Sequence, residues 1–280
     1  MKKIIILVLS LLLLVSFTGC SSKDNDADSK VIVVGATLVP HAEILNDVVK
    51  EVLAKDGWTL EVQEFNDYVT PNTALEEGSL IANYFQTLGY MNNQNEEGGL
   101  HLTAVIGVHI EPMGIYSKKH STLSELPDGA TIGVPNDTDN FARAIDLLVA
   151  QGLLNASGTK EELDSDSSKN PHGYKITPLD AAYLPRSLDD VDIAVINGNY
   201  ALESGLPQTN PAIAIEKFDA ETSVRRTNYI VIKQGNENDP RVLALIAAIN
   251  SQEVEDYINE HYKGSVIPSF IDANGNPVKR

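Results

Sequence analysis

Cysteine and basic residues are both scarce in this sequence. The chain of 280 residues contains one cysteine, so an intramolecular disulfide is excluded. Lysine and arginine number 21 against 39 aspartates and glutamates, which gives a formal net charge of −18 and an isoelectric point of about 4.6. Binding to nucleic acid requires a basic footprint for the phosphates. The composition therefore argues against nucleic acid as a partner.

The motifs of common enzyme classes are missing as well. The chain has no H-E-x-x-H zinc motif and no G-x-S-x-G nucleophile elbow, and the lysine after Gly158-Thr159 lacks the spacing of a phosphate-binding loop. The six histidines are scattered along the chain. His101 and His109 flank a predicted strand, so we expect structural or exposed positions for them rather than metal ligation. The sequence thus predicts a protein that is not an enzyme and that holds no metal or cofactor.

A hydrophobic run long enough to cross a membrane is also missing. Lys2 and Lys3 precede a largely apolar run of twelve residues, Ile4 to Val15, whereas a spanning helix needs about 20. The segment that follows, up to Gly19, is rich in small residues. A basic start, a short apolar stretch and small residues before a cleavage site are typical of a secretory signal. We therefore predict that residues 1–19 are a signal peptide.

The single cysteine, Cys20, stands directly after Thr18-Gly19, and this arrangement resembles a bacterial lipobox. The resemblance implies that Cys20 is lipidated and anchors the protein to the cell membrane on its extracytoplasmic face. The next ten residues, Ser21 to Lys30, include no large apolar side chain. Such a segment cannot contribute to a core, so residues 20–30 are predicted to be the lipidated cysteine and a flexible tether.

From Val31 onward, short apolar runs alternate with amphipathic segments. This alternation predicts βαβ units, an α/β fold and mixed, mostly parallel sheets. The polar stretch 157–173 is predicted to be a loop, with Leu163 as its one anchor to the core. The strands are predicted at 31–36, 59–65, 102–110, 130–134, 174–178, 191–197 and 228–233, and the helices at 42–55, 71–78, 136–152 and 239–262.

The strands fall into two sets, with crossings near Glu111-Pro112 and near Arg226-Thr227. We therefore expect residues 31–112 plus 228–280 to form lobe 1, and residues 113–227 to form lobe 2. Ligand sites in open α/β sheets lie beyond the carboxyl ends of strands, and clefts between domains favour ligands too. A ligand cleft between the two lobes is predicted.

One helix start has the features of an anion site. The strand ending at Pro135 leads into polar residues whose side chains can cap a helix, and the free N–H groups of such a start favour an anion. Asn140 and Arg143 are three residues apart and lie on one helix face. An arginine can match both oxygens of a carboxylate. The alternative from this stretch alone is a surface arginine that pairs with Asp139 or Asp146.

Several long segments, in the same order, resemble the NlpA/MetQ-type methionine-binding lipoproteins, the substrate-binding components of ABC importers. The resemblance implies a two-lobed, type 2 periplasmic-binding-protein fold that closes on a free amino acid. It also implies an ABC permease with a cytoplasmic ATPase as the partner. The segments that carry the resemblance are Glu64–Leu75, Ala82–Met91, Tyr116–Leu148, Leu184–Ala201 and Thr227–Ile232.

The resemblance also implies roles for individual polar residues. Asn140 and Arg143 match the positions that bind the ligand carboxylate. Asn197 and Asn228 match polar contacts to the amino-acid head group. The predicted ligand is methionine, captured by hinge closure and delivered to the permease.

The side-chain pocket shows one departure from the family. Tyr68, Phe85 and Tyr90 match its aromatic lining, although the residues alone would equally fit core packing. Where the family usually has a histidine and a proline, this chain has Thr87 and Gly89. Thr87 is smaller and cannot carry a charge, so a related amino acid or a short peptide remains an alternative ligand. A lipoprotein that mediates surface interactions is the other alternative.

Overall fold

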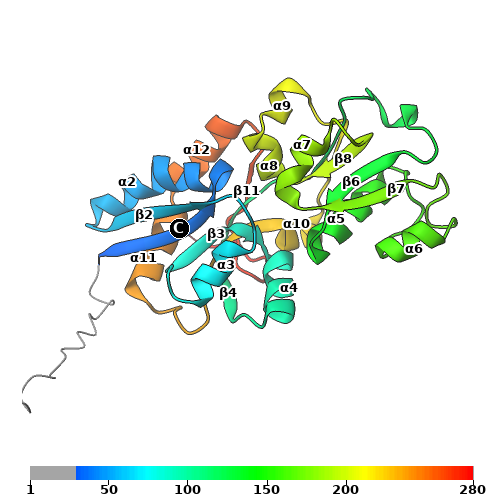
Figure 1. The fold of residues 1–280 in the computed structure, drawn as a ribbon. Helices are drawn as coiled ribbons and strands as arrows, with labels where there is room; N and C mark the ends of the chain where they lie inside the picture. The colour runs from blue at the N-terminus through cyan, green and yellow to red at the C-terminus, as the bar shows by residue number, and fades with distance from the viewer. Residues whose placement is uncertain (1–29, 280) are drawn as a thin grey trace, which may run out of the picture.

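The computed structural model describes residues 30–279, and the chain forms two lobes side by side (Figure 1). The first lobe contains a six-stranded sheet built from both ends of the described chain, and the second contains a five-stranded sheet built from its middle. The predicted signal peptide and Cys20 lie outside the described residues. Within residues 30–279, no helix combines the length and apolar character that a membrane crossing requires.

The sheet of the first lobe combines parallel and antiparallel pairing. Strand β1 pairs in parallel with β2 and β3, whereas β10 is antiparallel to β3 and β4. The strands are rich in β-branched and apolar residues, which fit a pleated surface buried on its faces. In order across the sheet, they are β11 (Ile267–Pro268), β4 (Leu102–Ile110), β10 (Thr227–Lys233), β3 (Ala82–Thr87), β1 (Val31–Thr37) and β2 (Thr59–Phe65).

The sheet of the second lobe is smaller and also mixed. Strand β6 is parallel to β7 and β8, and β5 is antiparallel to β8 and β9. In order, its strands are β7 (Lys175–Leu179), β6 (Thr131–Pro135), β8 (Ile193–Ile196), β5 (Gly114–Tyr116) and β9 (Ala214–Ile215). Mixed sheets are confirmed, but parallel pairing does not predominate in either sheet. The reason is that β5 and β10, which follow the two crossings between lobes, enter their sheets antiparallel to their neighbours.

Two helix predictions for the first lobe were imprecise. The segment after β1 starts with η2 (Leu38–Ala42), in which Val39 is extended, and continues with the π-helical η3 (Leu45–Val49) before α2 (Lys50–Lys55). The long C-terminal helix is two helices, α11 (Pro240–Ile249) and α12 (Gln252–Tyr262). It breaks because Ser251 caps α12 by accepting a hydrogen bond from the backbone nitrogen of Val254. The lobe also contains α3 (Thr70–Glu76) and α4 (Leu88–Gly98).

In the second lobe, α5 (Thr138–Ala150) is the helix whose start the sequence marked as polar. Asp137 caps it, and Ile145 and Leu148 are fully buried in the core of the lobe. The stretch predicted as a loop contains a short helix, α6 (Lys160–Ser165), because Thr159 and Glu162 form a capping box at its start. The remaining elements are η4 (Leu123–Glu125), η5 (Ala181–Tyr183), α7 (Leu184–Ser187), α8 (Gly198–Glu203), α9 (Leu206–Thr209) and α10 (Ala220–Arg226).

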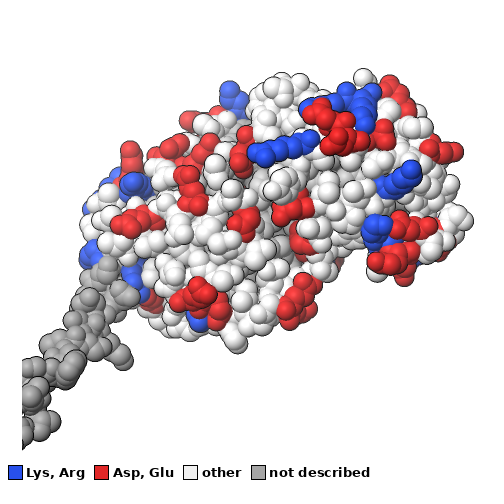
Figure 2. All heavy atoms as spheres, viewed as in Figure 1, with Lys and Arg blue, Asp and Glu red and all other residues white. Residues whose placement is uncertain are grey.

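The chain passes from the first sheet to the second between Ile110 and Gly114, and it returns between Ile215 and Thr227. The returning segment includes α10, which contacts α4 of the first lobe. Acidic side chains are spread over both lobes on the face shown in Figure 2, where the described residues form no continuous basic band. This surface agrees with the net charge of −18.

Candidate functional site

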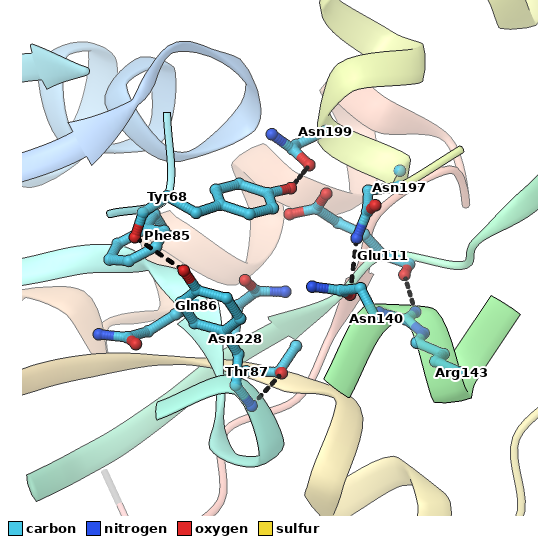
Figure 3. Close-up of a pocket in the computed structure, with 12 residues that line it drawn as sticks. Tyr68, Phe85, Gln86, Thr87, Glu111, Asn140, Arg143, Asn197, Asn199 and Asn228 are labelled. Atoms are coloured by element: carbon cyan, nitrogen blue, oxygen red, sulfur yellow. Dashed lines mark hydrogen bonds between the residues drawn. The ribbon is translucent and has the colours of Figure 1, made fainter. Parts of the chain in front are cut away.

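A pocket of about 340 Å³, including its open mouth, lies between the two lobes (Figure 3). Every ligand-site residue predicted from the sequence lines it: Tyr68, Phe85, Thr87, Tyr90, Asn140, Arg143, Asn197 and Asn228. The sequence analysis missed the other lining residues, which are Gln86, Glu111, Gly198 and Asn199.

Aromatic rings form one wall of this pocket. Tyr68 has its ring centroid 5.7 Å from that of Phe85 and 5.6 Å from that of Tyr90. It also contacts the second lobe, because its ring lies 5.0 Å from that of Tyr200 and its hydroxyl donates to Oδ1 of Asn199. Tyr68 thus joins the lobes across the site. Aromatic pairs at such separations add to the stabilisation from burial alone.

Thr87 has a structural task besides lining the pocket. It is the N-cap of α4, and its hydroxyl accepts a hydrogen bond from the backbone nitrogen of Tyr90 at 3.3 Å. The cap orients the first turn of α4, which carries Tyr90 into the aromatic wall. Position 87 therefore influences the pocket through the backbone as well as through its own size.

Arg143 is buried at the pocket and pairs with a carboxylate from another element. Its Nε donates to Glu216 at 3.0 Å, and its Nη2 donates both to Glu216 and to the backbone oxygen of Glu111. Burial alone would lower the pKa of Arg143, but the carboxylate of Glu216 outweighs it and raises the pKa above the usual value. Nη1 donates no hydrogen bond to any described residue, so this nitrogen is available to a ligand.

The alternative pairing of Arg143 with Asp139 or Asp146 was wrong. Asp139 accepts instead from Arg225 and Arg226 of α10, and Asp146 accepts from Ser157. Asp139 precedes Arg143 by four residues, but its side chain turns toward α4 and α10. Helical spacing permits such a pair without requiring it, and the contacts between elements decided the outcome.

Asn140 is held by its neighbours on both sides. Its Nδ2 donates to Asp137 at 3.0 Å, and its Oδ1 accepts from Nδ2 of Asn197 at 2.8 Å. Two other amide atoms at the pocket, Oδ1 of Asn197 and Nδ2 of Asn199, are buried and have no hydrogen-bond partner among the described residues. Leaving a buried polar atom unpaired costs about 1–3 kcal/mol. These two atoms therefore indicate where a polar ligand would bind.

A buried network of hydrogen bonds surrounds Glu111, where the chain leaves the first lobe. Glu111 accepts from Nε2 of His109 at 2.6 Å and lies 3.2 Å from Nε2 of His41. That nitrogen of His41 is also 3.1 Å from Oδ1 of Asn228. Burial raises the pKa of Glu111 and lowers the pKa of His41 to about 4 and that of His109 to about 3. Both histidines are therefore neutral near pH 7.

The prediction that the histidines are scattered holds for the sequence but not in space. Ligand atoms of His41, His109 and Glu111 lie within 4.8 Å of one another, so these residues could in principle hold a metal ion. The separation of 2.6 Å between His109 and Glu111 is that of a hydrogen bond. Two ligands each about 2.0–2.2 Å from one zinc ion stand farther apart. The geometry is therefore that of a hydrogen-bonded network.

The residues that were missed left weak signals in the sequence. Glu111 stands at the predicted crossing between lobes, and Asn199 is two residues after the predicted Asn197. Gly198 lies between them because the crossing segment approaches closely there. A Cβ at this position would lie 2.6 Å from Cβ of Glu111. No local pattern indicated that the crossing segment and the start of α8 would touch.

We expect Gly89→Ala to weaken ligand binding by about 1–3 kcal/mol, the usual cost of overpacking. A Cβ at Gly89, in the first turn of α4, would lie 2.6 Å from Oδ1 of Asp139 on the second lobe. Asp139 cannot easily move, because two arginines of α10 hold its carboxylate. Isothermal titration of both proteins with methionine measures the change.

Gly98→Ala is the matched control, since it lies at the other end of α4, where an added Cβ would be 3.4 Å from Cγ of Leu100, an ordinary contact distance. Equal affinities for Gly89→Ala and Gly98→Ala would contradict the proposed closeness of the two lobes at this point.

Comparison with known proteins gave consistent matches. A model of the family described as NlpA lipoprotein matches residues 32–270. The membrane lipoprotein TpN32 of Treponema pallidum is 38% identical over 237 residues, which cover 84% of this chain and 86% of that protein. The methionine-binding lipoprotein MetQ of Bacillus subtilis is 33% identical, with 96% and 99% covered. A nutrient binding protein from Burkholderia cenocepacia, solved bound to methionine, is 40% identical and superposes with a TM-score of 0.76, covering 85% of this chain and 100% of that one.

Proposed function

This chain belongs to the NlpA lipoprotein family, and from that membership we propose that it captures free methionine and delivers it to an ABC permease. Relatives named as methionine-binding lipoproteins and a neighbour solved with methionine support this ligand. Its action is binding and release rather than catalysis. A lipid on Cys20 would hold it at the extracytoplasmic face of the membrane.

The observation that carries the proposal is the pocket between the lobes, which combines the groups an amino acid requires. Arg143 offers a guanidinium to a carboxylate, and Oδ1 of Asn197 and Nδ2 of Asn199 offer an unpaired acceptor and donor. Arg143, Asn197 and Asn199 come from the second lobe, and the aromatic wall comes from the first. A ligand that contacts both lobes stabilises the arrangement in which they are closed, so binding drives closure about the hinge between them.

The roles proposed for the other site residues follow from their contacts. Arg143 binds the ligand carboxylate, and Asn140 assists by orienting Asn197 toward the head group. Asn228 contributes its amide from the first lobe, where His41 fixes its Oδ1. The thioether packs against the aromatic wall formed by Tyr68, Phe85 and Tyr90, a favourable contact for sulfur.

The partner for release would be a permease with a cytoplasmic ATPase. A solved neighbour from Coxiella burnetii, 36% identical, is named as a periplasmic substrate-binding protein of an ABC transporter, and this supports such a partner. Delivery of ligand from the closed lipoprotein to the membrane components is therefore part of the proposal.

Isothermal titration of the ligand-stripped lipoprotein against L- and D-methionine, other amino acids and dipeptides tests this function. We expect a methionine enantiomer to bind more tightly than any other compound in the panel. Tighter binding of a different amino acid or of a dipeptide would assign that ligand instead and would point to Thr87 as the altered position. A protein that binds no compound in the panel would contradict the importer function and favour a surface-interaction lipoprotein.

A further inference from the structure

Glu111 is a buried acid at the pocket that forms no direct ion pair with a lysine or arginine side chain of the described residues, although the nearby charge of Arg143 and a backbone hydrogen bond from Asn199 partly offset the effect of burial on its pKa. Its exposed fraction is 5%, and the nearest ring nitrogens belong to two histidines that are neutral at pH 7. Arg143 is near, but its hydrogen bond goes to the backbone oxygen of Glu111. A buried carboxylate costs several kcal/mol unless it is paired and hydrogen-bonded.

We propose that Glu111 receives the ammonium group of the ligand, and that His41 and His109 are positioning residues that hold its carboxylate for this contact. The inference rests on the proposed capture of a free amino acid and names the group that recognises its amino end. The bound cation would supply the missing partner of the buried acid.

The hydrogen bonds around the histidines fix the direction of their donors. An ionised Glu111 can only accept, so Nε2 of His109 carries the proton given to it, and Nδ1 of His109 accepts from the hydroxyl of Tyr84. In the same way the hydroxyl of Thr37 donates to Nδ1 of His41 at 2.8 Å. Nε2 of His41 then donates toward Glu111 and Asn228. This arrangement gives every ring nitrogen a partner and presents the carboxylate with two donors.

The position of Glu111 suits the ammonium group of a bound amino acid better than the carboxylate or the side chain of that ligand. Figure 3 shows its carboxyl group on the same side of the pocket as Asn197 and Asn199. The unpaired Oδ1 of Asn197 is an acceptor and adds a second oxygen for the same cation. The Arg143 guanidinium lies at the α5 side and serves the opposite charge. The two charged groups of the pocket thus match the two ends of a zwitterion.

The pH dependence of binding follows from the same groups. Burial raises the pKa of Glu111 in the free protein, and a bound ammonium would lower it again. Its contribution to affinity is therefore present above the raised pKa and is lost as the pH falls through it. The groups that face Glu111 are His41, His109 and Arg143, with the hydroxyls of Tyr68 and Tyr84 nearby.

The test compares wild type with Glu111→Gln by titration against methionine and against 4-(methylthio)butanoate, the same molecule without the amino group. Gln retains an acceptor for His109 but carries no charge. We expect the methionine affinity of Glu111→Gln to fall about 10- to 150-fold, the range for hydrogen bonds to charged groups. The affinity for the deaminated acid should change less than about 3-fold, because it makes no ammonium contact. Glu61→Gln, an exposed residue of β2, is the matched control and should behave as wild type.

The histidine roles require a readout that a loss of structure would not produce. We expect His109→Leu to reduce the preference for methionine over the deaminated acid, and His109→Gln to restore it through its amide donor. A purely structural residue would lower both affinities by the same factor.

The outcomes separate the two proposals. If wild type binds methionine but Glu111→Gln binds it equally well, or loses both ligands alike, the inference is overturned and the proposed function stands. If another amino acid binds wild type best, the same comparison is made with that amino acid and its deaminated counterpart in place of methionine and 4-(methylthio)butanoate. If wild type binds no free amino acid, both the proposed function and this inference fall.

Discussion

Replacing Arg143 with alanine is expected to weaken methionine binding by about 2–5 kcal/mol, the usual cost of removing one partner of a buried charge pair. The reason lies in the position of the guanidinium. Arg143 lines the pocket and is only 4% exposed, and Nη1 has no acceptor among the described residues. Without it the ligand carboxylate would lose its cationic partner, and Glu216 would keep only the more distant Arg226, 3.9 Å away.

Titration calorimetry measures this loss, and circular dichroism shows whether the variant remains folded. Arg186→Ala is the matched control, because Arg186 is an exposed arginine of the same lobe. Arg143→Lys separates charge from shape: a lysine keeps the charge but cannot reach Glu216 and the ligand with one planar group. If Arg143→Ala binds methionine as tightly as Arg186→Ala does, Arg143 is not in the ligand site.

The second large effect is expected from Asp139→Ala, which should lower the free energy of unfolding by about 3–5 kcal/mol. Asp139 is 1% exposed and accepts from Arg225 and Arg226 of α10. Arg226 is also buried, and its other acidic neighbour, Glu216, is 3.9 Å away and already bound to Arg143. Removing Asp139 would leave the buried Arg143 and Arg226 to share the carboxylate of Glu216.

Urea unfolding of the ligand-free protein measures the change. Asp146→Ala provides the comparison, since Asp146 is exposed on the same helix and, within residues 30–279, accepts only from Ser157. Surface changes of this kind alter stability by about 0.5 kcal/mol or less. A similar stability for the two variants would show that the ion pairs between α5 and α10 contribute little, as exposed pairs commonly do.

Most of the fold was predictable because it depends on short-range patterns. The strand at 59–65 and the strand at 102–110 were predicted with the bounds that the structure shows, since the first alternates between polar and apolar residues and the second is rich in apolar and β-branched residues. Helix α5 also agrees, with Asp137 as its cap. Strand β3 (82–87) was not predicted as a strand, because its mixture of asparagine, tyrosine and glutamine has no clear period. Its polar side chains are buried against α3, where Asn72, Asn83 and Gln86 bond to one another.

The candidate site was predictable in the kinds of residue it contains but not in how they act. The family resemblance indicated Asn140 and Arg143 together, and both line the pocket. The resemblance could not show that Asn140 bonds to Asn197, which follows it by 57 residues, or that Arg143 pairs with Glu216, 73 residues later. The roles of these residues toward a ligand stay predictions until binding is measured.

By itself the sequence determined the α/β class, the positions of most strands and helices, and the strongly acidic net charge. It could do so because these features depend on the period of apolar residues and on composition. The tertiary structure alone decided which polar groups meet: His41 with Asn228, which is 187 residues away, His109 with Glu111, and Asp139 with α10. Such contacts depend on how the lobes and their crossing segments pack, and no local pattern records that packing.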